Sequence, residues 1–265
     1  DNSLTASVLN TLDGNTSGTI NASNITALTG SASDIESIYD SPGITGLGNE
    51  DITLFYSIPT AALLKRLDSD TSGTINTQFL TSIKGKASDL IDIYASSGIS
   101  NLGNEAVNVS SGSASISQAN TLAAATSGVV TATISDGDMA TLAGLTETGN
   151  AYTITITDTS VAAAALNILD GKTTVAINAS NITTLTGSVA DLNTAYASSG
   201  ISGLGNEAVN VNSGTASTSQ ANTLAADTSG VVTATISDGD MATLAGLTET
   251  GNAYTITITD TSVDA

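Results

Sequence analysis

The sequence predicts an α/β repeat solenoid, in which each coil adds a strand to a parallel sheet on one side and a short helix on the other side. Two observations predict this class. The chain repeats itself, because residues 99–161 recur as 201–263 with five substitutions. Within the repeats, segments with the two-residue alternation of β-strands are followed by segments with helical spacing. A mostly-β right-handed solenoid is the alternative that the same repeats allow.

A shorter repeat lies inside this duplication. A Leu precedes a turn rich in Thr, Ser and Gly five times, at spacings of 47 or 55 residues. Periods of this size are typical of solenoids and other repeat arrays. We therefore expect one continuous solenoid over 1–265 made of five such units. The expected units are 1–52, 53–107, 108–158, 159–209 and 210–265, of which 53–107 is irregular in sequence.

Residues 129–158 illustrate the expected elements. The segments 129–135 and 152–158 alternate between apolar and polar residues, as half-buried strands do. Between them, the segment 135–138 (Ser-Asp-Gly-Asp) supplies N-cap residues, and Met139 and Leu142 follow at helical spacing. This order predicts a strand, a short helix and a second strand.

The pattern continues through the next unit. The segment 161–169 has apolar residues at helical spacing and follows the N-cap residues Thr159 and Ser160. A strand is expected at 174–178. A further helix is expected over 188–200, because this segment opens with a capping-box pattern and ends at a glycine.

The spacing of the strands predicts how they pair. The strands expected at 129, 152 and 174 leave room for one short helix and two turns between them, so consecutive strands should be parallel with right-handed crossovers. Small apolar side chains would fill the narrow gap between sheet and helices, which explains why only 3% of the residues are aromatic. Gly- and Asn-containing turns at 46–49, 101–104 and 203–206 would close corners that need positive φ.

The outward positions of the predicted strands are rich in threonine. Threonine is a good exposed strand residue, which is the simplest interpretation. Alternatively, this threonine ladder binds an ordered surface: another solenoid, a glycan or ice. The ladder consists of Thr131, Thr133, Thr153, Thr155, Thr157, Thr233, Thr235, Thr255, Thr257 and Thr259.

Two kinds of acidic turn are candidate calcium sites. Asp68, Asp70 and Ser72 match the first ligand positions of an EF-hand loop, but Phe79 stands where the loop needs a bidentate Glu. Sister units lose these ligands and keep the turn, which favours a turn over a metal site. The second kind of acidic turn would bind calcium weakly, or its aspartates would cap the helix that follows. These turns contain Asp136 and Asp138 in one copy and Asp238 and Asp240 in the other.

Charge and composition exclude several functions. The formal net charge is −20, which argues against nucleic acid as a partner. With no His and no Cys, zinc and haem sites, thiol catalysis and Ser-His-Asp triads lack their ligands or bases. Paired carboxylates recur in copies, whereas an active site is normally single. We therefore expect no catalytic residues, no enzyme activity, and no cofactor other than a weakly bound calcium.

Unit 53–107 carries four of the five basic residues of the chain. They are candidate contacts with the acidic repeats of a neighbouring molecule, although a diverged repeat would also explain them. Their positions are Lys65, Arg66, Lys84 and Lys86.

The ends of the chain resemble its interior. Residues 1–4 carry no signal-peptide pattern, and no run approaches the length of a membrane span, so we expect no membrane insertion. Because the repeats run to both ends, we interpret the chain as a piece of a longer protein.

The amino-acid sequences of the repeats resemble those of a known class of repeat proteins. The strings at 169–209, 127–161 and 229–263 resemble the tandem repeats of giant secreted or cell-surface proteins of marine cyanobacteria, and the resemblance covers nearly the whole chain. It implies an extracellular, non-catalytic repeat region linked to surface, adhesion, motility or matrix, and it carries no functional residues over. We expect a filament or matrix subunit, or a spacer, that associates with itself or with further repeats. An adhesin using the threonine ladder is the alternative.

Overall fold

The computed structural model describes residues 2–55 and 57–262 and has the α/β fold that the sequence predicts. Helices and strands alternate along the chain, and neighbouring strands in its sheets are parallel. The chain divides into two units, Asp1–Thr133 and Ile134–Ala265. These two units are compact bodies in space, whereas the five units predicted from the sequence are repeats along the chain. The structure therefore does not test the division into five repeats, which stays a prediction.

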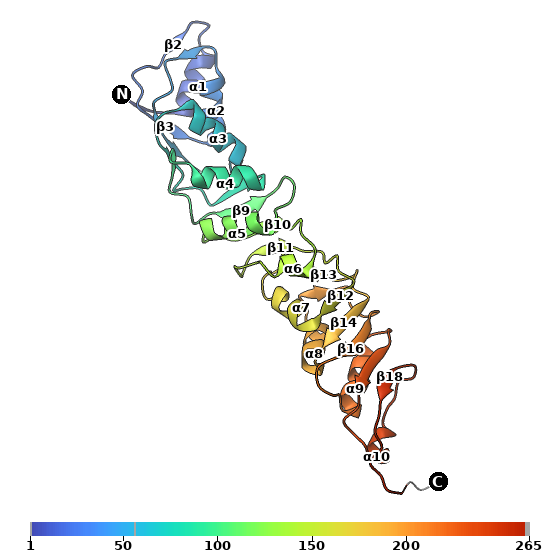
Figure 1. Cartoon of the computed structure of the whole chain (residues 1–265). Coiled ribbons are helices and arrows are strands. Elements are labelled where there is room, and N and C mark those ends of the chain that lie inside the picture. Colours follow the sequence, from blue (N-terminus) through green and yellow to red (C-terminus); the bar gives the residue numbers. More distant parts are fainter. Residues whose placement is uncertain (1, 56, 263–265) are drawn as a thin grey trace. The chain divides into compact units, whose positions relative to one another are not determined.

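Both units use the same elements (Figure 1). Unit 1 contains β1 (Ser3–Thr5), α1 (Ala6–Gly14), β2 (Ile20–Asn21), β3 (Ala27–Gly30), α2 (Ala32–Asp40), β4 (Ile44–Thr45), β5 (Asp51–Leu54), α3 (Ala61–Asp70), β6 (Ile75–Asn76), β7 (Ser82–Gly85), α4 (Ala87–Ala95), β8 (Ile99–Ser100), β9 (Ala106–Val109), α5 (Ile116–Ala125) and β10 (Val130–Thr133). Unit 2 contains α6 (Met139–Leu142), β11 (Ala151–Thr153), β12 (Ser160–Ala162), α7 (Ala163–Asp170), β13 (Ile177–Asn178), β14 (Thr184–Gly187), α8 (Val189–Ala197), β15 (Ile201–Ser202), β16 (Ala208–Val211), α9 (Thr218–Asp227), β17 (Val232–Thr235), α10 (Met241–Leu244) and β18 (Ala253–Thr255).

The strands pair with strands one coil away. In unit 1 the main sheet has the order β1-β3-β5-β6-β8, and β7, β9 and β10 pair in a second sheet. In unit 2 the order is β12-β14-β16-β17-β18. Ser3 pairs with Ala27, Ile52 with Ile75, and Thr233 with Ala253, so one coil spans 24, 23 or 20 residues. Two coils therefore make up each sequence unit of roughly 50 residues.

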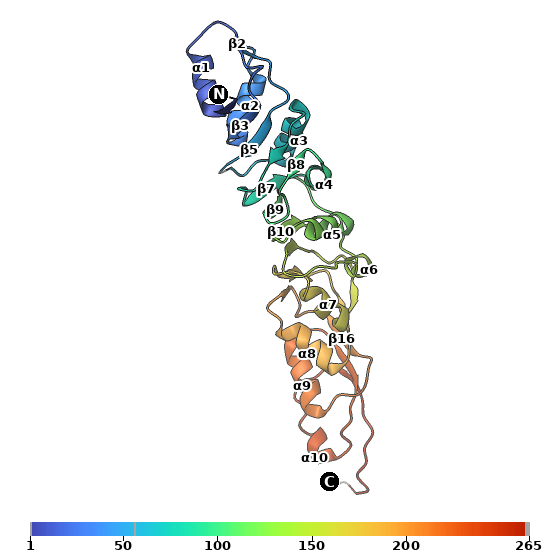
Figure 2. The ribbon, with the colours of Figure 1, turned by 90° about the vertical axis from the view of Figure 1, so that its left-hand side faces the viewer.

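The helices of each unit stack beside the sheet. In unit 2, α7, α8 and α9 follow one another on one side and the strands run on the other (Figure 2). This arrangement has the predicted sheet-and-helix layers, and the helices of eight to ten residues exclude the mostly-β alternative.

Helix starts and cores follow a repeated pattern. Ser31 caps α2, because its hydroxyl accepts a hydrogen bond from the amide of Asp34 at 3.1 Å. The first residue of the helix, Ala32, is buried together with Ile35 and Ile38. The start of α1 needs a small residue, because adjacent coils approach closely there: a Cβ on Gly30 would lie 3.2 Å from the Cβ of Ala6.

Several strands are shorter than the sequence predicts. Within the expected strand 152–158, β11 ends at Thr153, and only an isolated bridge joins Thr155 to Asn178. The expected strand 174–178 is reduced to two residues, β13. The expected helix 161–169 begins later, since its first two residues belong to β12. Each coil turns corners on both sides of its strands, so parallel pairing lasts for only a few residues.

The predicted corners have the expected positive φ. Gly46 and Gly203 both have φ 86°, and a Cβ on either would lie 2.8 Å from a main-chain nitrogen of the preceding coil. The equivalent residue, Asn101, has φ 65°, a conformation that Asn tolerates better than other side chains. The side-chain Nδ2 of Asn101 donates to Oδ1 of Asn76 at 2.9 Å.

A glycine at another corner lets two coils touch. Gly230 packs against the main chain of Glu207, and a Cβ there would overlap the carbonyl oxygen of Glu207. Gly73 and Gly128 have the same relation to Glu50 and Glu105. These contacts leave no room for a side chain between neighbouring coils.

Gly230→Ala should therefore destabilise the protein by about 2 kcal/mol or more, because the main chain of one coil must move. The measurement is chemical unfolding followed by circular dichroism. Gly14→Ala is the matched control, since a Cβ at Gly14 meets no atom within 4 Å. Equal stability of the two variants would contradict this account of the corner.

Candidate functional site

The structure places all ten residues of the threonine ladder at exposed positions. The alternate residues Ala132, Ile154 and Ile156 point inward and are buried. Across the sheet, Thr235 pairs with Thr255, whereas other rows combine Thr with Asn and Ala. Within unit 2 the ladder is therefore a polar, uncharged surface with interrupted rows.

The EF-hand-like candidate residues have separate partners. Helix α3 extends to Asp70, so Asp68 and Asp70 lie two positions apart on a helix, where side chains do not face each other. The carboxylate of Asp68 accepts the hydroxyl of Ser96 at 2.7 Å, and the hydroxyl of Ser72 donates to the carbonyl oxygen of Gly48 at 3.2 Å. The structure does not bring these three oxygen ligands together.

The same corner recurs around other aspartates. Ser41 donates to Asp13 at 2.7 Å, and Ser198 donates to Asp170 at 2.6 Å. Each serine hydroxyl also accepts the amide of the glycine two residues later. Asp68 thus belongs to a repeated Asp-Ser-Gly corner that joins a helix end to the next coil.

The second group of acidic candidates lies at helix starts. Asp138 and Asp240 are the N-caps of α6 and α10 and accept the amides of Thr141 and Thr243 at 2.9 and 2.8 Å. These amide hydrogen bonds lower the pKa of both exposed carboxyls.

Further carboxylates cap helices from the side. Asp238 accepts the amide of Thr218 at the start of α9, at 2.7 Å. Asp158 and Asp260, which the sequence analysis did not single out, accept the amides of Met139 and Met241 at 2.6 and 2.7 Å. Asp136, the remaining candidate, is half-buried. Helix capping is thus the observed role of most of these acidic residues.

Two of the four candidate cations bridge helices within unit 1. Nζ of Lys65 on α3 lies 2.9 and 2.7 Å from the carboxylates of Asp89 and Asp92 on α4. Arg66 pairs with Glu36 on α2, and also lies 3.3 Å from Asp40. Hydrogen bonds to Asp92 and Asp89 raise the pKa of Lys65.

The other two cations are arranged differently. Lys84 lies in β7 and Lys86 is the N-cap residue of α4, and both are exposed. They remain available for a contact with another molecule. The predicted group of four therefore separates into two cations that pair with acidic residues of unit 1 and two exposed cations on β7 and at the start of α4.

The sequence analysis missed three buried glutamates. Glu50, Glu105 and Glu207 are at most 1% exposed. Both carboxylate oxygens of Glu50 accept the amide of Gly48 at 2.9 Å. Its Oε2 also accepts the hydroxyl of Tyr39 at 2.6 Å. Together these donors replace the water that each carboxylate loses on burial.

The cluster repeats with the same spacing in the other copies. Tyr94 donates to Glu105, and Tyr196 donates to Glu207, each tyrosine preceding its glutamate by eleven residues. A threonine of the next coil completes each cluster, as Thr71 donates to the main-chain carbonyl of Glu50 at 2.7 Å. The threefold recurrence of Tyr and Glu at this spacing was the signal in the sequence.

Burial and hydrogen bonds act on the tyrosines. The pKa values of Tyr39, Tyr94 and Tyr196 are raised far above the usual range for tyrosine. The main cause is burial, and the second is the hydrogen bond to the glutamate. Burial, with the charge of Glu147 adding to it, raises the pKa of Tyr152 to about 12.

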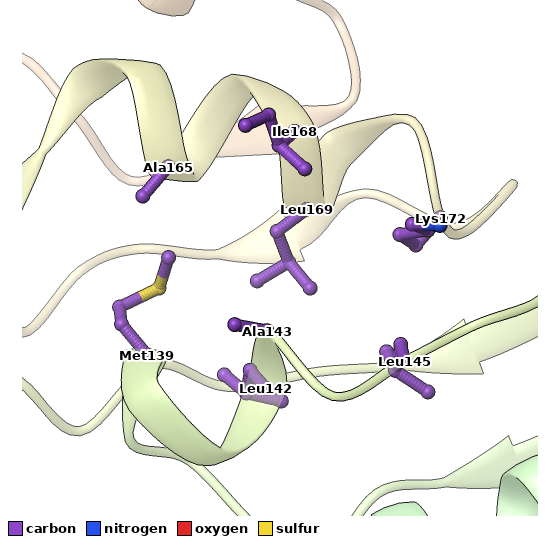
Figure 3. Close-up of a pocket in the computed structure, with 8 residues that line it drawn as sticks. All are labelled: Met139, Leu142, Ala143, Leu145, Ala165, Ile168, Leu169 and Lys172. Atoms are coloured by element: carbon purple, nitrogen blue, oxygen red, sulfur yellow. The ribbon is translucent and has the colours of Figure 1, made fainter.

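A small apolar pocket lies between α6 and α7 (Figure 3). Leu169 of α7 points toward Leu142 and Ala143 of α6. Nζ of Lys172 at its border donates to the carbonyl oxygen of Thr146 at 3.0 Å. The complete lining is Met139, Leu142, Ala143, Leu145, Ala165, Ile168, Leu169 and Lys172. The pocket holds no pair of acidic or nucleophilic groups suited to catalysis.

Comparison with protein-family models, with curated proteins and with solved structures gave no match. Over residues 2–55 and 57–262, no three acidic side chains form a group that could hold a metal ion. None of the described helices has the length and apolar character needed to cross a membrane.

The tyrosine clusters predict a loss of stability at high pH. A tyrosine with a raised pKa holds its proton more tightly in the folded than in the unfolded chain, so its contribution is complete below pH 10 and falls as pH rises above 10. Melting temperatures between pH 8 and pH 12 measure this decline.

Tyr94→Phe should flatten this decline and, by removing a donor to buried Glu105, cost about 1–3 kcal/mol at neutral pH. Tyr254→Phe is the control for the cost at neutral pH, because this half-buried tyrosine donates to the carbonyl oxygen of Ala221 and to no glutamate. It is not a control for the pH profile, since burial and the charge of Glu249 raise the pKa of Tyr254 as well. Equal pH profiles for the parent and Tyr94→Phe would refute the explanation.

Proposed function

We propose that the chain is a non-catalytic structural element of an extracellular assembly, either a filament or matrix subunit or a spacer in a giant surface protein. One observation carries the proposal: the polar groups that could form a site occur in copies and hold one coil to the next. The Glu-Tyr-Thr cluster occurs three times, and so does the Asp-Ser-Gly corner. Proteins that act as repeats distribute their interactions in this way.

The charge suits this function. A formal charge of −20 keeps a repeat protein soluble and repels non-specific partners. The scarce cations Lys65 and Arg66 connect α3 to its neighbouring helices, which is a structural use of charge. The resemblance of the repeats to cyanobacterial surface proteins supports the extracellular setting.

Antibodies against the chain should label intact, unpermeabilised cells of the source organism, because a surface or matrix element is accessible from outside. Antibodies against a cytoplasmic protein serve as the control for intact membranes. Labelling that requires permeabilisation would contradict the extracellular function.

A second function, adhesion to ice or to a glycan, is favoured by the exposure of the whole threonine ladder. The described residues offer no group of three acidic side chains for calcium, so calcium dependence enters only as an arm of the test below. Where ladder residues lie in paired strands, as Thr235 and Thr255 do, their hydroxyl and methyl groups have the regular spacing of parallel strands, near 4.8 Å. The interruptions by Asn210 and Ala253 weaken this candidate.

An adhesive ladder predicts that Thr155→Lys with Thr257→Lys reduces binding at least about tenfold, since a charge disrupts the flat surface. Ice-crystal shaping and glycan-array binding, each with calcium and with EDTA, are the measurements. Thr194→Lys on helix α8 is the control. Binding that survives the double substitution would exclude the ladder as the adhesive surface.

A further inference from the structure

One surface inside unit 1 differs from its equivalents in the other repeats. The loop between β5 and α3 reads Phe-Tyr-Ser-Ile-Pro-Thr over 55–60, whereas the equivalent loops at 110–115 and 212–217 contain only Ser, Thr, Asn, Gly and Ala. One coil later, Phe79 stands where the equivalent segments have Asn24 and Asn181. These replacements put large apolar side chains at corners that carry small or polar residues in the other repeats.

Two further replacements in the same coil add positive charge. Lys84 and Lys86 stand where the equivalent segments have a threonine and a serine. The serines, Ser31 and Ser188, cap α2 and α8 by accepting amides at 3.1 and 3.2 Å, whereas Lys86 makes no capping hydrogen bond to α4. A cation at the start of a helix also opposes the helix dipole. Lys86 therefore costs α4 stability, a cost that a contact with another molecule would explain.

The replaced residues lie together on adjacent coils. The ring centroids of Phe55 and Phe79 are 4.8 Å apart. The amide of Lys84 donates to the carbonyl oxygen of Pro59 at 3.2 Å. Ile58, next to this proline, is 58% exposed, and Phe79 is 45% exposed. We call the surface of Phe55, Ile58, Phe79, Lys84 and Lys86 the basic-apolar patch.

The coils on both sides of the basic-apolar patch belong to unit 1. Helix α3 packs against α2 of the preceding coils, and α4 packs against α5 of the following coil. The repeat itself therefore leaves Ile58 and Phe79 exposed. Exposed apolar side chains beside charged ones are typical of surfaces that bind another molecule.

The charges of the chain favour a second copy as that molecule. Two exposed lysines attract an acidic partner. Outside 53–107 the chain has twenty acidic residues and one basic residue, Lys172. A second copy therefore offers acidic surface, and the partner must also cover the phenylalanine and isoleucine side chains.

One corner of unit 2 combines acidic and apolar side chains. Val231 is 47% exposed and follows Asp227, the last residue of α9, by four positions. The exposed Glu249 lies in the neighbouring loop, whose Asn252 accepts the amide of Val232 at 2.8 Å through its side chain. We call the surface of Asp227, Val231 and Glu249 the acidic corner.

The exposure of this corner is a property of the repeat. Val129, the equivalent of Val231, is also 47% exposed, and Glu147, the equivalent of Glu249, is exposed as well, although further coils follow both of them. The equivalent of Asp227 is Ala125, so the acidic corner has one carboxylate more than its counterpart. Two carboxylates match the two lysines of the basic-apolar patch.

We propose that the basic-apolar patch binds the acidic corner of a second copy of this chain. In this contact Lys84 and Lys86 pair with Asp227 and Glu249, and Val231 covers the apolar side chains of Ile58 and Phe79. Because the two surfaces differ, one copy can bind two neighbours and the contact can add copies in series. This inference deepens the proposed structural function, on which it rests, by naming the partner.

The net charge of the chain does not prevent this contact. Each copy has a formal charge of −20, but charges are screened over about 8 Å at physiological ionic strength. Charges close to the contact therefore dominate, and there lysines face carboxylates. The measurements below are made at this ionic strength.

The test is sedimentation velocity of the full chain over a concentration series, in which we expect species that grow with concentration. The patch variant, Phe79→Asn with Lys84→Thr and Lys86→Ser, restores the residues of the equivalent segments and should weaken association at least about tenfold. Ile168→Asn with Lys172→Thr is the control, because it removes a 67% exposed apolar side chain and a cation from another surface.

Mixing two variants gives the sharpest result. The corner variant, Asp227→Lys with Glu249→Lys, should also lose self-association. It keeps its basic-apolar patch and the patch variant keeps its acidic corner, so the mixture should form a one-to-one dimer and nothing larger. Melting temperatures equal to the parent's establish that the variants fold.

Several results would overturn the proposal. They are a parent that stays monomeric at every concentration, a patch or corner variant that associates like the parent, and a mixture without the dimer. An acidic polysaccharide is the other class of partner, and alginate is its probe. A monomeric parent that binds alginate through the basic-apolar patch would assign the patch to a polysaccharide instead of a second copy.

This experiment is independent of the test of the proposed function. Surface labelling with a monomeric chain would overturn the contact between copies and leave the structural function in place. Labelling confined to permeabilised cells would overturn the function whatever the chain does in solution.

Discussion

The whole structure depends on one constraint: the chain must return after 20 to 24 residues to pair in parallel with itself. This return places each helix beside the previous helix and each buried Leu or Ile above an equivalent one. The buried Glu-Tyr-Thr clusters secure the return, because a glutamate bonded to amides and to a tyrosine is costly to move out of place. The glycines that touch the glutamate main chain set how closely coils approach.

Much of this architecture could be predicted from the sequence. The duplication and the alternation of strand and helix patterns predicted the α/β repeat, and the Gly- and Asn-containing turns predicted corners such as Gly203. Strand lengths were harder, because β13 is limited by pairing with a coil that is distant in sequence. The start of α7 was also placed too early, since an apolar residue such as Val161 suits a strand as well as a helix.

The candidate site was less predictable than the fold. A glutamate in a glycine-rich turn is ordinarily exposed, and only its three amide and hydroxyl donors make burial of Glu105 tolerable. Similarly, Asp68 had the spacing of a calcium ligand, yet its carboxylate accepts a hydrogen bond from the hydroxyl of Ser96, 28 residues later in the chain. Partners that far apart in sequence become visible only when the period of the coil is known.

The identity of residues 139–158 and 241–260 also has a consequence for inheritance. Unequal crossing-over between the two gene segments would add or remove 102 residues in one event, the distance between equivalent positions such as Ile99 and Ile201. The amino-acid sequence at the new joint would be the same as at an existing one, so every strand there would pair in the same register as before. The number of coils is thus a trait that a lineage can change in whole steps, without passing through an unfolded intermediate length.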